Sequence, residues 1–139
     1  MSFLLDTNVV SEWAKPLPNS GVISWLENAD EDQVFLSAIT IAELRYGIER
    51  TPVGSRSKIL ANWLEHDLTI RFEGRIFTID HAVADTCGQV IAQSEKVGRK
   101  LETIDAFIAA TARVHRCTIV TRNTSDFQAV TNDLLNPWS

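Results

Sequence analysis

The sequence has few of the residues on which several classes of functional site depend. It contains two cysteines and three histidines among 139 residues. Neither set has the close spacing of a zinc site, so we predict no role as ligands for His66, His81 or His115. A glycine-rich phosphate loop and a Gly-x-Ser-x-Gly turn are both absent. No apolar run reaches the length of about eighteen residues that a membrane-spanning helix needs. These absences exclude zinc, P-loop and serine-hydrolase chemistry.

Positive charge is also scarce. The chain has 13 Lys and Arg against 18 Asp and Glu, for a net charge of −5 and an isoelectric point near 5.1. A protein that binds nucleic acid through bulk electrostatics carries an excess of basic residues. Such binding is therefore disfavoured, unless a metal ion or a basic partner supplies positive charge where acids cluster.

Size and composition predict one globular domain that spans residues 1–139. Hydrophobic residues make up 45% of the chain and charged residues 22%, as in ordinary folded proteins. Cys87 lies in an apolar, helix-like segment, and no close Cys pair is present, so we expect both thiols to be buried and reduced. No leader pattern is visible at the start of the chain. We therefore expect a cytoplasmic protein with no membrane association.

Short apolar runs alternate with helical patterns along the chain. The predicted strands are 3–5, 34–37, 75–79 and 118–120. The predicted helices are 7–13, from 19 or 20 to about 29, 40–49, 55–74, 82–97 and 103–116. This alternation predicts an α/β fold in which a short, mostly parallel sheet is covered by helices on both faces, as a three-layer α/β/α arrangement.

Several acids in this pattern also have a structural interpretation. Thr40 and Glu43 have the spacing of a capping box, which predicts Thr40 as the N-cap of its helix. Asp6 and Asp80 each end a predicted strand just before a helix, where an N-cap is common. Asp80 lacks company matching that which Thr7 and Asn8 give Asp6, and it is interpreted as a cap. Asp105 falls in the first turn of a helix, where the helix dipole favours a negative charge.

Four polar stretches nevertheless fall where a parallel sheet gathers ligands. Asp6-Thr7-Asn8 follows the first predicted strand and 121–126 follows the last, so they share the carboxyl edge of the sheet. Glu43 and Asp105 lie near the amino ends of helices that can face this edge. The segment 107–112 is so apolar that Asp105 is predicted to be buried and to need a cation or hydrogen-bond donors.

Carboxylates that meet in one pocket indicate a hard divalent cation. Oxygen ligands suit Mg²⁺ or Mn²⁺, and such sites commonly act on phosphate esters, so the pattern favours a metal-dependent nuclease. The supporting polar residues are Thr7, Asn8, Thr121 and Asn123. Neighbouring carboxylates raise one another's pKa, so we expect metal binding to release protons and activity to fall at acidic pH.

The stretches 4–12, 37–48, 105–112 and 120–127, with 136–138 at the end, resemble the PIN-domain family. Within it, they resemble most the VapC-type and FitB-type toxins of bacterial toxin–antitoxin pairs. The resemblance runs nearly end to end and implies a PIN-like fold and a Mg²⁺-dependent endoribonuclease, with Mn²⁺ as a substitute. It places the catalytic, metal-binding acids at Asp6, Glu43 and Asp105. Some members carry the fourth acid where this chain has Asn123, and we predict that Asp126 takes that role.

The resemblance also implies partners. We expect a small antitoxin whose tail covers the acidic pocket, tRNA or ribosomal RNA as substrate, and a homodimer or larger assembly. The predicted RNA-backbone contacts are Lys15, Arg45, Arg99 and Lys100. The tryptophans have two interpretations, partner contact or core packing; they are Trp13, Trp25, Trp63 and Trp138.

Two other functions fit parts of the pattern. A non-catalytic module with the same fold could act only through its antitoxin. A phosphotransfer domain of the receiver or haloacid-dehalogenase type also collects aspartates at strand ends. Asp6-Thr7-Asn8 lacks the second Asp of the dehalogenase motif, however, and no Lys follows the last strands to hold phosphate. The nuclease interpretation is therefore preferred.

Overall fold

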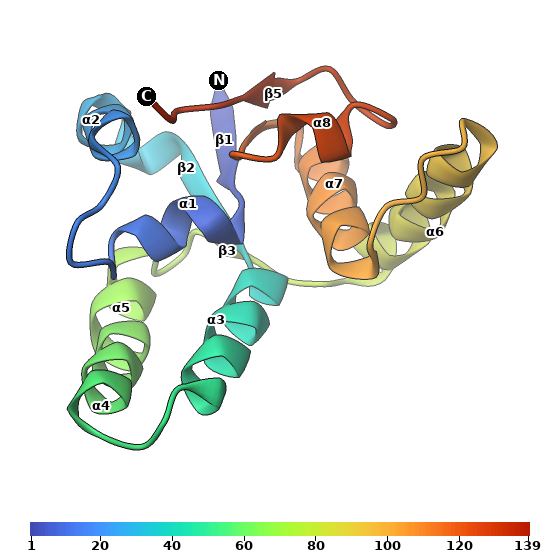
Figure 1. Ribbon diagram of the computed structural model, residues 1–139. Coiled ribbons are helices and arrows are strands. Elements are labelled where there is room, and N and C mark those ends of the chain that lie inside the picture. The colour runs from blue at the N-terminus through green and yellow to red at the C-terminus, as the bar shows by residue number, and fades with distance from the viewer.

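Five short parallel strands form the centre of the molecule (Figure 1). In the computed structural model, which describes residues 1–139, they are β1 (Ser2–Leu5), β2 (Val34–Ser37), β3 (Ile76–Phe77), β4 (Cys117–Val120) and β5 (Leu134–Leu135). Their order in the sheet is β3-β2-β1-β4-β5, and every neighbouring pair is parallel. The predicted α/β class with a mostly parallel sheet is confirmed.

Helices connect and cover the strands. They are α1 (Thr7–Glu12), α2 (Ser20–Asn28), α3 (Ala38–Arg50), α4 (Ser55–Asn62), α5 (Thr69–Arg71), α6 (His81–Lys96), α7 (Thr103–His115) and α8 (Thr124–Phe127). A short 3₁₀ turn, Glu31–Gln33, precedes β2, and a π-helical turn, Trp63–Leu68, joins α4 to α5. The predicted helix 55–74 is thus interrupted by this wider turn, in which Thr69 Oγ1 donates to the carbonyl of Leu64 at 2.7 Å.

Two hydrophobic clusters lie on opposite faces of the sheet. Leu4 and Ile119 pack with α6 and α7, whereas Leu5 and Val120 pack with α1, α2, α3 and the α4–α5 segment. Successive residues of a strand point to opposite faces, so a strand covered on both sides must be apolar throughout. The run Phe3-Leu4-Leu5 satisfies this requirement and ends at the polar Asp6. The chain therefore passes from the hydrophobic core at Leu5 to a polar residue at Asp6 in a single step.

The predicted cap of α3 is wrong. Helix α3 begins at Ala38, and Ser37 is its N-cap, with the Oγ atom accepting from the N–H of Ile39 at 3.1 Å. Ser37 is the last residue of β2, so its hydroxyl reaches the exposed N–H groups before Thr40 can. Thr40 is fully buried within the helix. Glu43 consequently lies in the second turn, where no capping role uses its carboxylate.

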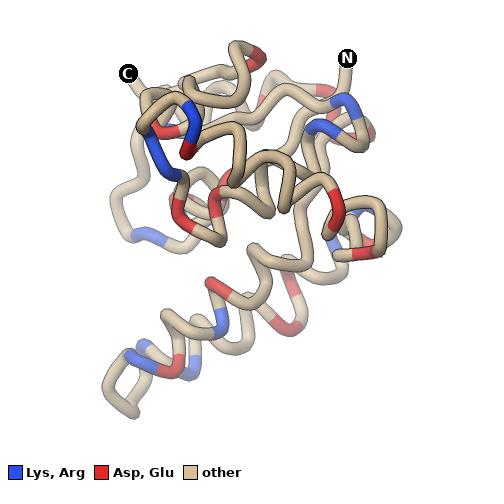
Figure 2. Tube along the Cα trace, turned by 90° about the vertical axis from the view of Figure 1, so that its right-hand side faces the viewer, with Lys and Arg blue, Asp and Glu red and all other residues tan.

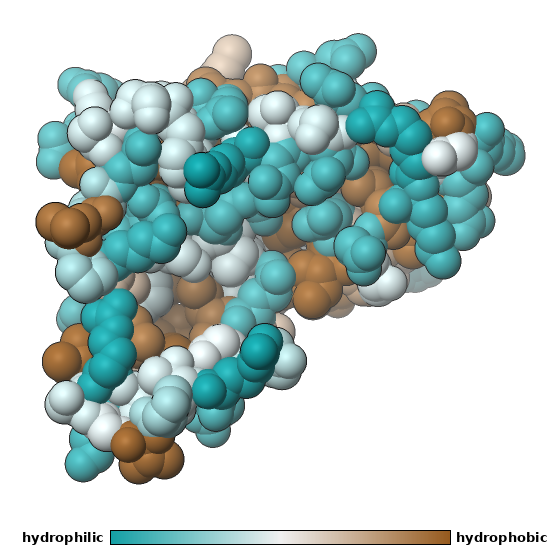
Figure 3. Space-filling model, viewed as in Figure 1, coloured by the Kyte–Doolittle hydropathy of each residue, from teal (hydrophilic) through white to brown (hydrophobic).

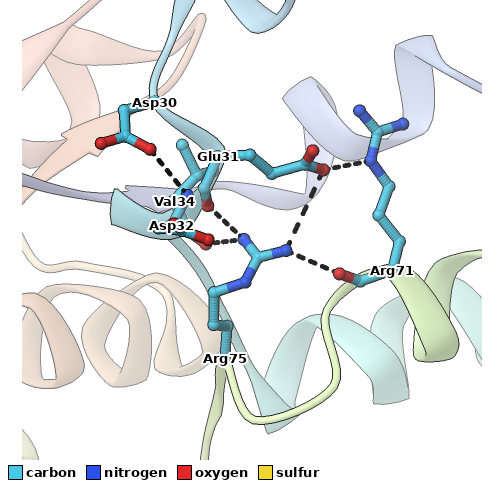
Figure 4. Close-up of polar contacts among 6 residues, drawn as sticks. All are labelled: Asp30, Glu31, Asp32, Val34, Arg71 and Arg75. Carbon is cyan, nitrogen blue, oxygen red and sulfur yellow. Dashed lines mark hydrogen bonds and ion pairs between the residues drawn. The ribbon is translucent and has the colours of Figure 1, made fainter.

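The predicted strand 75–79 is shorter in the structure; the Arg75 carbonyl still accepts from the N–H of Leu36 at 3.0 Å, and the Arg75 side chain makes further bonds. Its guanidinium donates to the carbonyls of Val34 and Arg71, each at 2.6 Å, and to that of Glu31, whose carboxylate pairs with Arg71 (Figure 4). Only Ile76 and Phe77 pair with β2. The network ties the start of β2 to the end of α5.

The sequence patterns did not predict β5 or α8. Strand β5 is two residues long and pairs with Ile119 and Val120 of β4. Helix α8 is a single turn in the polar stretch that follows the last predicted strand. Both elements are too short to show a hydrophobic period. No helix of the structure is long and apolar enough to span a membrane, and Cys87 and Cys117 are buried and unpaired, as predicted.

The C-terminal segment packs against the start of α2. Asn19 caps this helix, and its Oδ1 atom also accepts from the N–H of Ser139 at 3.2 Å. A Cβ atom on Gly21 would lie 2.6 Å from the carbonyl oxygen of Pro137 and 2.7 Å from the nitrogen of Ser139. The missing side chain of Gly21 therefore makes room for the chain end.

We expect Gly21→Ala to lower the free energy of unfolding by about 1–2 kcal/mol, because the tail must shift away from α2. Gly88→Ala is the matched control. Gly88 lies within α6 with open space where a Cβ would be, so alanine there should raise stability by about 0.5–1 kcal/mol. Urea unfolding of both variants measures this. Equal effects at the two positions would show that the tail does not depend on Gly21.

Candidate functional site

Asp6 occupies the carboxyl end of β1, next to the end of β4. The register places Leu5 opposite Val120, and the N–H of Asp6 donates to the carbonyl of Val120 at 2.9 Å. The Asp6 carboxylate is 5% exposed and accepts from the N–H of Thr7 and from Thr121 Oγ1, each at 2.8 Å. Burial raises the pKa of Asp6, whereas the Thr121 and Thr7 bonds oppose that rise. Thr121 itself is fully buried, so it is a fixed donor.

Glu43 reaches the same edge from α3. Its carboxylate accepts from the hydroxyl of Thr7, which also lies 3.3 Å from Thr40 Oγ1. Burial raises the pKa of Glu43, the Thr7 bond lowers it, and the charge of Asp6 raises it further. Thr7 is therefore a direct structural link between the end of β1 and α3.

Asp105 lies in the first turn of α7, and no hydrogen bond holds its carboxylate. Its pKa is raised to about 6, first by burial and then by the charges of Asp6, Asp126 and Glu43, with Glu102 adding to the effect. Burial and like charge act in the same direction here, and no donor opposes them. Asp105 is thus the least compensated carboxylate of the group.

Asp126 is exposed on α8 and carries no hydrogen bond on its side chain. Its charge raises the pKa of both Asp6 and Asp105, and it lines one depression with Asp105. Asn123, which precedes α8, makes no cap bond through its side chain; its N–H donates to Thr121 Oγ1 at 3.0 Å. Of the two candidates for the fourth acidic position, Asp126 is the one whose charge acts on the other acids.

We call Asp6, Glu43, Asp105 and Asp126 the acid site. Figure 1 shows α1, α3 and α7 beginning beside the same region of the sheet, with α8 next to it. Asn8 supports the site, since its Nδ2 atom lies 3.4 Å from Asp6 Oδ2 and its Oδ1 atom accepts from the N–H of Arg122 at 3.3 Å. The four acids and four supporting polar residues named from the sequence thus surround one sheet edge.

The donor set of the acid site fits a hard cation. It consists of carboxylate and hydroxyl oxygens with no nitrogen or sulfur ligand, which is the set that Mg²⁺ and Mn²⁺ prefer. As the side chains stand, no three His, Cys, Asp or Glu residues are grouped closely enough to form a metal site. Asp6 and Glu43 are held by hydrogen bonds, whereas Asp105 and Asp126 are not. The two unheld carboxylates are therefore free to turn toward an ion.

The predicted RNA contacts lie in different electrostatic settings. Lys15 forms an ion pair with Glu12, Arg45 pairs with Glu65 at 2.8 Å, and Lys100 lies 3.8 Å from Glu95. Arg99 pairs with no carboxylate; its guanidinium donates to the carbonyl of Ser125 at 2.6 Å. Figure 2 shows basic positions scattered among acidic ones along the trace.

Two hollows open beside the acid site. One is lined by Asp105, Asp126, Glu102, Arg99, Lys100 and Leu101. The other includes Thr7 and Glu43 and continues between α1, α3 and α4, where its walls are Leu44, Ile48, Leu60 and Trp63. Figure 3 shows the second hollow between the body of the molecule and the projecting helices below it.

Three residues near the site were not predicted from the sequence. Glu12 is 2% exposed. Burial raises its pKa, but bonds from Lys15 and from the N–H of Asn19, with the charges of Lys15 and Arg122, bring the pKa below its ordinary value. Arg56 lines the second hollow, and Arg122 directly follows Thr121. The only available signal was position: Glu12 is three residues before Lys15, and Arg122 adjoins a predicted site residue.

The tryptophans are mostly occupied by intramolecular contacts. The rings of Trp25 and Phe3 meet edge to face at 5.1 Å. The guanidinium of Arg71 lies 4.4 Å from the ring of Trp13, and that of Arg122 lies 5.4 Å from the ring of Trp138. Trp63 lies partly buried in the wall of the second hollow.

Comparison with known proteins gives consistent matches. A family model described as the PIN domain matches residues 3–132. The toxin FitB of Neisseria gonorrhoeae is 40% identical over 135 residues, covering 97% of each protein. The VapC ribonuclease Y4jK of Sinorhizobium fredii is 38% identical over 135 residues, covering 97% of this chain and 96% of that protein. The crystal structure of FitAcB from Neisseria gonorrhoeae has a TM-score of 0.92 at 40% identity and 98% coverage of both chains.

We expect Asp105→Asn to stabilise the metal-free protein at neutral pH. The pKa of Asp105 in the folded protein, about 6, lies above the ordinary value of an aspartate side chain, 3.8. The wild type therefore loses stability as the pH rises through this interval, and the charge-free variant should be more stable above it by on the order of 1–3 kcal/mol. Chemical unfolding in EDTA, from about pH 4 to pH 8, measures the difference. Glu102→Gln, which changes an exposed neighbour of Asp105, should raise the free energy of unfolding by less than Asp105→Asn does. A variant no more stable than wild type at about pH 8 would contradict the cost assigned to Asp105.

Proposed function

The chain belongs to the PIN-domain family, and we propose that it is a metal-dependent endoribonuclease that acts as the toxin of a toxin–antitoxin pair. One observation carries the proposal: Asp6, Glu43, Asp105 and Asp126 converge at the carboxyl edge of a parallel sheet with PIN topology. Family membership agrees with the predicted fold. The names of the relatives, a toxin and a VapC ribonuclease, support the activity.

Asp6 and Asp105 are the proposed direct ligands of the metal ion, with Glu43 and Asp126 completing its surroundings. Mg²⁺ is the proposed ion and Mn²⁺ a substitute, since both prefer oxygen donors. When bound, a divalent ion offsets the charge of the phosphodiester and lowers the pKa of a water molecule that can attack it. Without that positive charge the four acids would repel an RNA phosphate.

The residues of the chain position the reacting groups. Thr121 and the N–H of Thr7 fix both oxygens of Asp6, so this carboxylate presents a constant geometry. The Thr7 hydroxyl holds Glu43, and Asn8 joins Asp6 to the loop after β4. Because these bonds join β1 to α3 and to the end of β4, and the Thr121 bond is buried, the Asp6 half of the acid site is the better fixed one. Asp105 and Asp126 form the adjustable half.

The proposed partners are an RNA, with tRNA or ribosomal RNA as the class, and a small antitoxin protein. The second hollow beside Glu43 has apolar walls, and exposed apolar side chains stand near it on the projecting helices, including Tyr46 and Ile59. Apolar walls together with exposed apolar side chains on the same helices favour a protein partner. A homodimer or larger assembly is part of the proposal.

Metal binding should release protons. Asp105 has a pKa of about 6, and the pKa values of Asp6 and Glu43 are also raised. A ligand must be deprotonated, so Mg²⁺ competes with protons below about pH 6 and both affinity and cleavage fall there. Calorimetric titration with Mg²⁺ in two buffers of different ionisation enthalpy measures the protons released. Asp105→Asn should abolish most of the release, and equal release from this variant would assign the protons to another group.

Asp6→Asn should abolish RNA cleavage, by roughly 100-fold or more, because it removes a fixed ligand charge. The matched control is Asp80→Asn. Like Asp6, Asp80 directly precedes a helix, and it caps α6 by accepting from the N–H of Val83 at 3.0 Å. Asparagine caps helices as well as aspartate does, so this variant should keep both fold and cleavage. The assay uses a panel of tRNA and structured RNA, with Mg²⁺ or EDTA, after the antitoxin is removed.

The other outcomes of this assay discriminate between functions. Equal cleavage by wild type and Asp6→Asn would reveal a contaminating nuclease. No cleavage by the wild type on any RNA would favour a non-catalytic module that acts through its antitoxin. Cleavage that persists in EDTA would contradict the metal requirement.

A further inference from the structure

The acid site needs positive charge beyond a metal ion if a negatively charged strand is to lie across it. The residues that can provide it are the cations that line the two hollows or adjoin the site: Lys15, Arg56, Arg99, Lys100 and Arg122. These cations differ in what holds them. That difference decides how much charge each can offer to a phosphate.

Cations paired with carboxylates offer little. Lys15 forms an ion pair with the buried Glu12. Arg45 lies two residues after Glu43 in α3 and forms an ion pair with Glu65. A phosphate contact from either residue must break an ion pair and leave a carboxylate uncompensated. The net charge of each pair is zero, so neither pair attracts RNA at a distance.

Two arginines are held by backbone carbonyls instead. Arg56 Nη2 donates to the carbonyl of Ala14 at 2.7 Å, at the rim of the hollow that contains Glu43. Arg99 Nη2 donates to the carbonyl of Ser125 at 2.6 Å, in the hollow that contains Asp105 and Asp126. No carboxylate lies within ion-pair distance of either guanidinium, since neither occurs among the salt bridges of the structure. Each keeps its full charge and most of its donors.

Arg122 is held by an aromatic ring. Its guanidinium lies 5.4 Å from the centre of the Trp138 ring. The backbone N–H of Arg122 donates to Oδ1 of Asn8, and Asn8 also contacts Asp6. Arg122 too is absent from the ion pairs, although it lies near enough to Glu12 to help lower the pKa of that residue. Trp138 belongs to the tail that Asn19 binds through Ser139. The C-terminal tail thus orients a cation one residue from Thr121.

We propose that Arg56, Arg99 and Arg122 are the residues that bind the RNA backbone on the two sides of the scissile phosphate. A guanidinium oriented by a neutral partner is preorganised for phosphate oxygens without losing charge. The three positions border the acid site from α4, from the α6–α7 loop and from the end of β4. This inference rests on the proposed ribonuclease function. It adds Arg56 and Arg122 to the predicted contacts and removes Lys15 and Arg45 from them, since both are ion-paired.

The test is the salt dependence of RNA binding. A fluorescein-labelled single-stranded RNA is titrated with protein carrying Asp6→Asn, to prevent cleavage, and anisotropy is read at several KCl concentrations. The affinity falls as salt rises, so the slope of log K against log salt is negative. Each of Arg56→Ala, Arg99→Ala and Arg122→Ala should make this slope less steep by about 0.7–1 and weaken binding several-fold. Arg45→Ala, the matched control, should leave the slope unchanged.

Two further variants separate charge from orientation. Arg122→Lys keeps the charge, so it should keep the slope. Trp138→Ala leaves Arg122 in place but removes its support, so it should weaken binding about twofold to fivefold with the slope preserved. Circular dichroism melts verify that every variant is folded. A variant that fails to fold is replaced by its lysine counterpart, whose affinity should fall with the slope intact because bidentate contact is lost.

The outcomes distinguish this inference from the proposed function. Cleavage by the wild type, together with slopes that the three alanine variants leave unchanged or that Arg45→Ala lowers equally, overturns the arginine assignment alone. A wild-type protein that neither binds nor cleaves RNA overturns the ribonuclease proposal and this inference with it.

Discussion

The parallel pairing of β1 with β4, in the register that sets Leu5 opposite Val120, places Asp6 and Thr121 side by side. Both residues leave the core at the same level of the sheet, so a buried hydroxyl meets a buried carboxylate at 2.8 Å. An unpartnered carboxylate at 5% exposure would cost several kcal/mol. The fold can bury Asp6 only because this register supplies a donor, and the other acids gather around that fixed point.

The same arrangement explains why the acid site is a compromise between stability and chemistry. Thr7 and Thr121 compensate Asp6 and Glu43, but nothing in the chain compensates Asp105, whose pKa of about 6 records the cost. A buried donor beside Asp105 would stabilise the protein and would also occupy the oxygens that a cation needs. The missing donor is therefore consistent with a site that relies on a bound ion for part of its stability.

The sequence was sufficient to predict the features of this site that follow from local pattern. An apolar run ending in Asp6 fixes a strand end, and the alternation of strands and helices fixes the edge at which Thr121 must meet it. The capping box predicted for Thr40 and Glu43 was wrong. Ser37, at the end of β2, lies closer to the first N–H groups of α3 and caps the helix instead. Strand β5 and helix α8 depend on long-range pairing and tertiary packing, which two-residue and four-residue patterns do not reveal.

Local sequence pattern also did not predict which charged residues pair with one another, and this pairing matters for an acidic protein that we propose acts on RNA. Lys15 and Arg122 both lie beside the site in sequence, yet Glu12 neutralises the first and Trp138 supports the second. Net charge counts these residues equally. A phosphate does not, because an ion-paired lysine must first give up its partner, whereas Arg122 forms no ion pair, although Glu12 lies near it. The net charge of −5 therefore does not show how much charge each cation beside the acid site can offer to a phosphate.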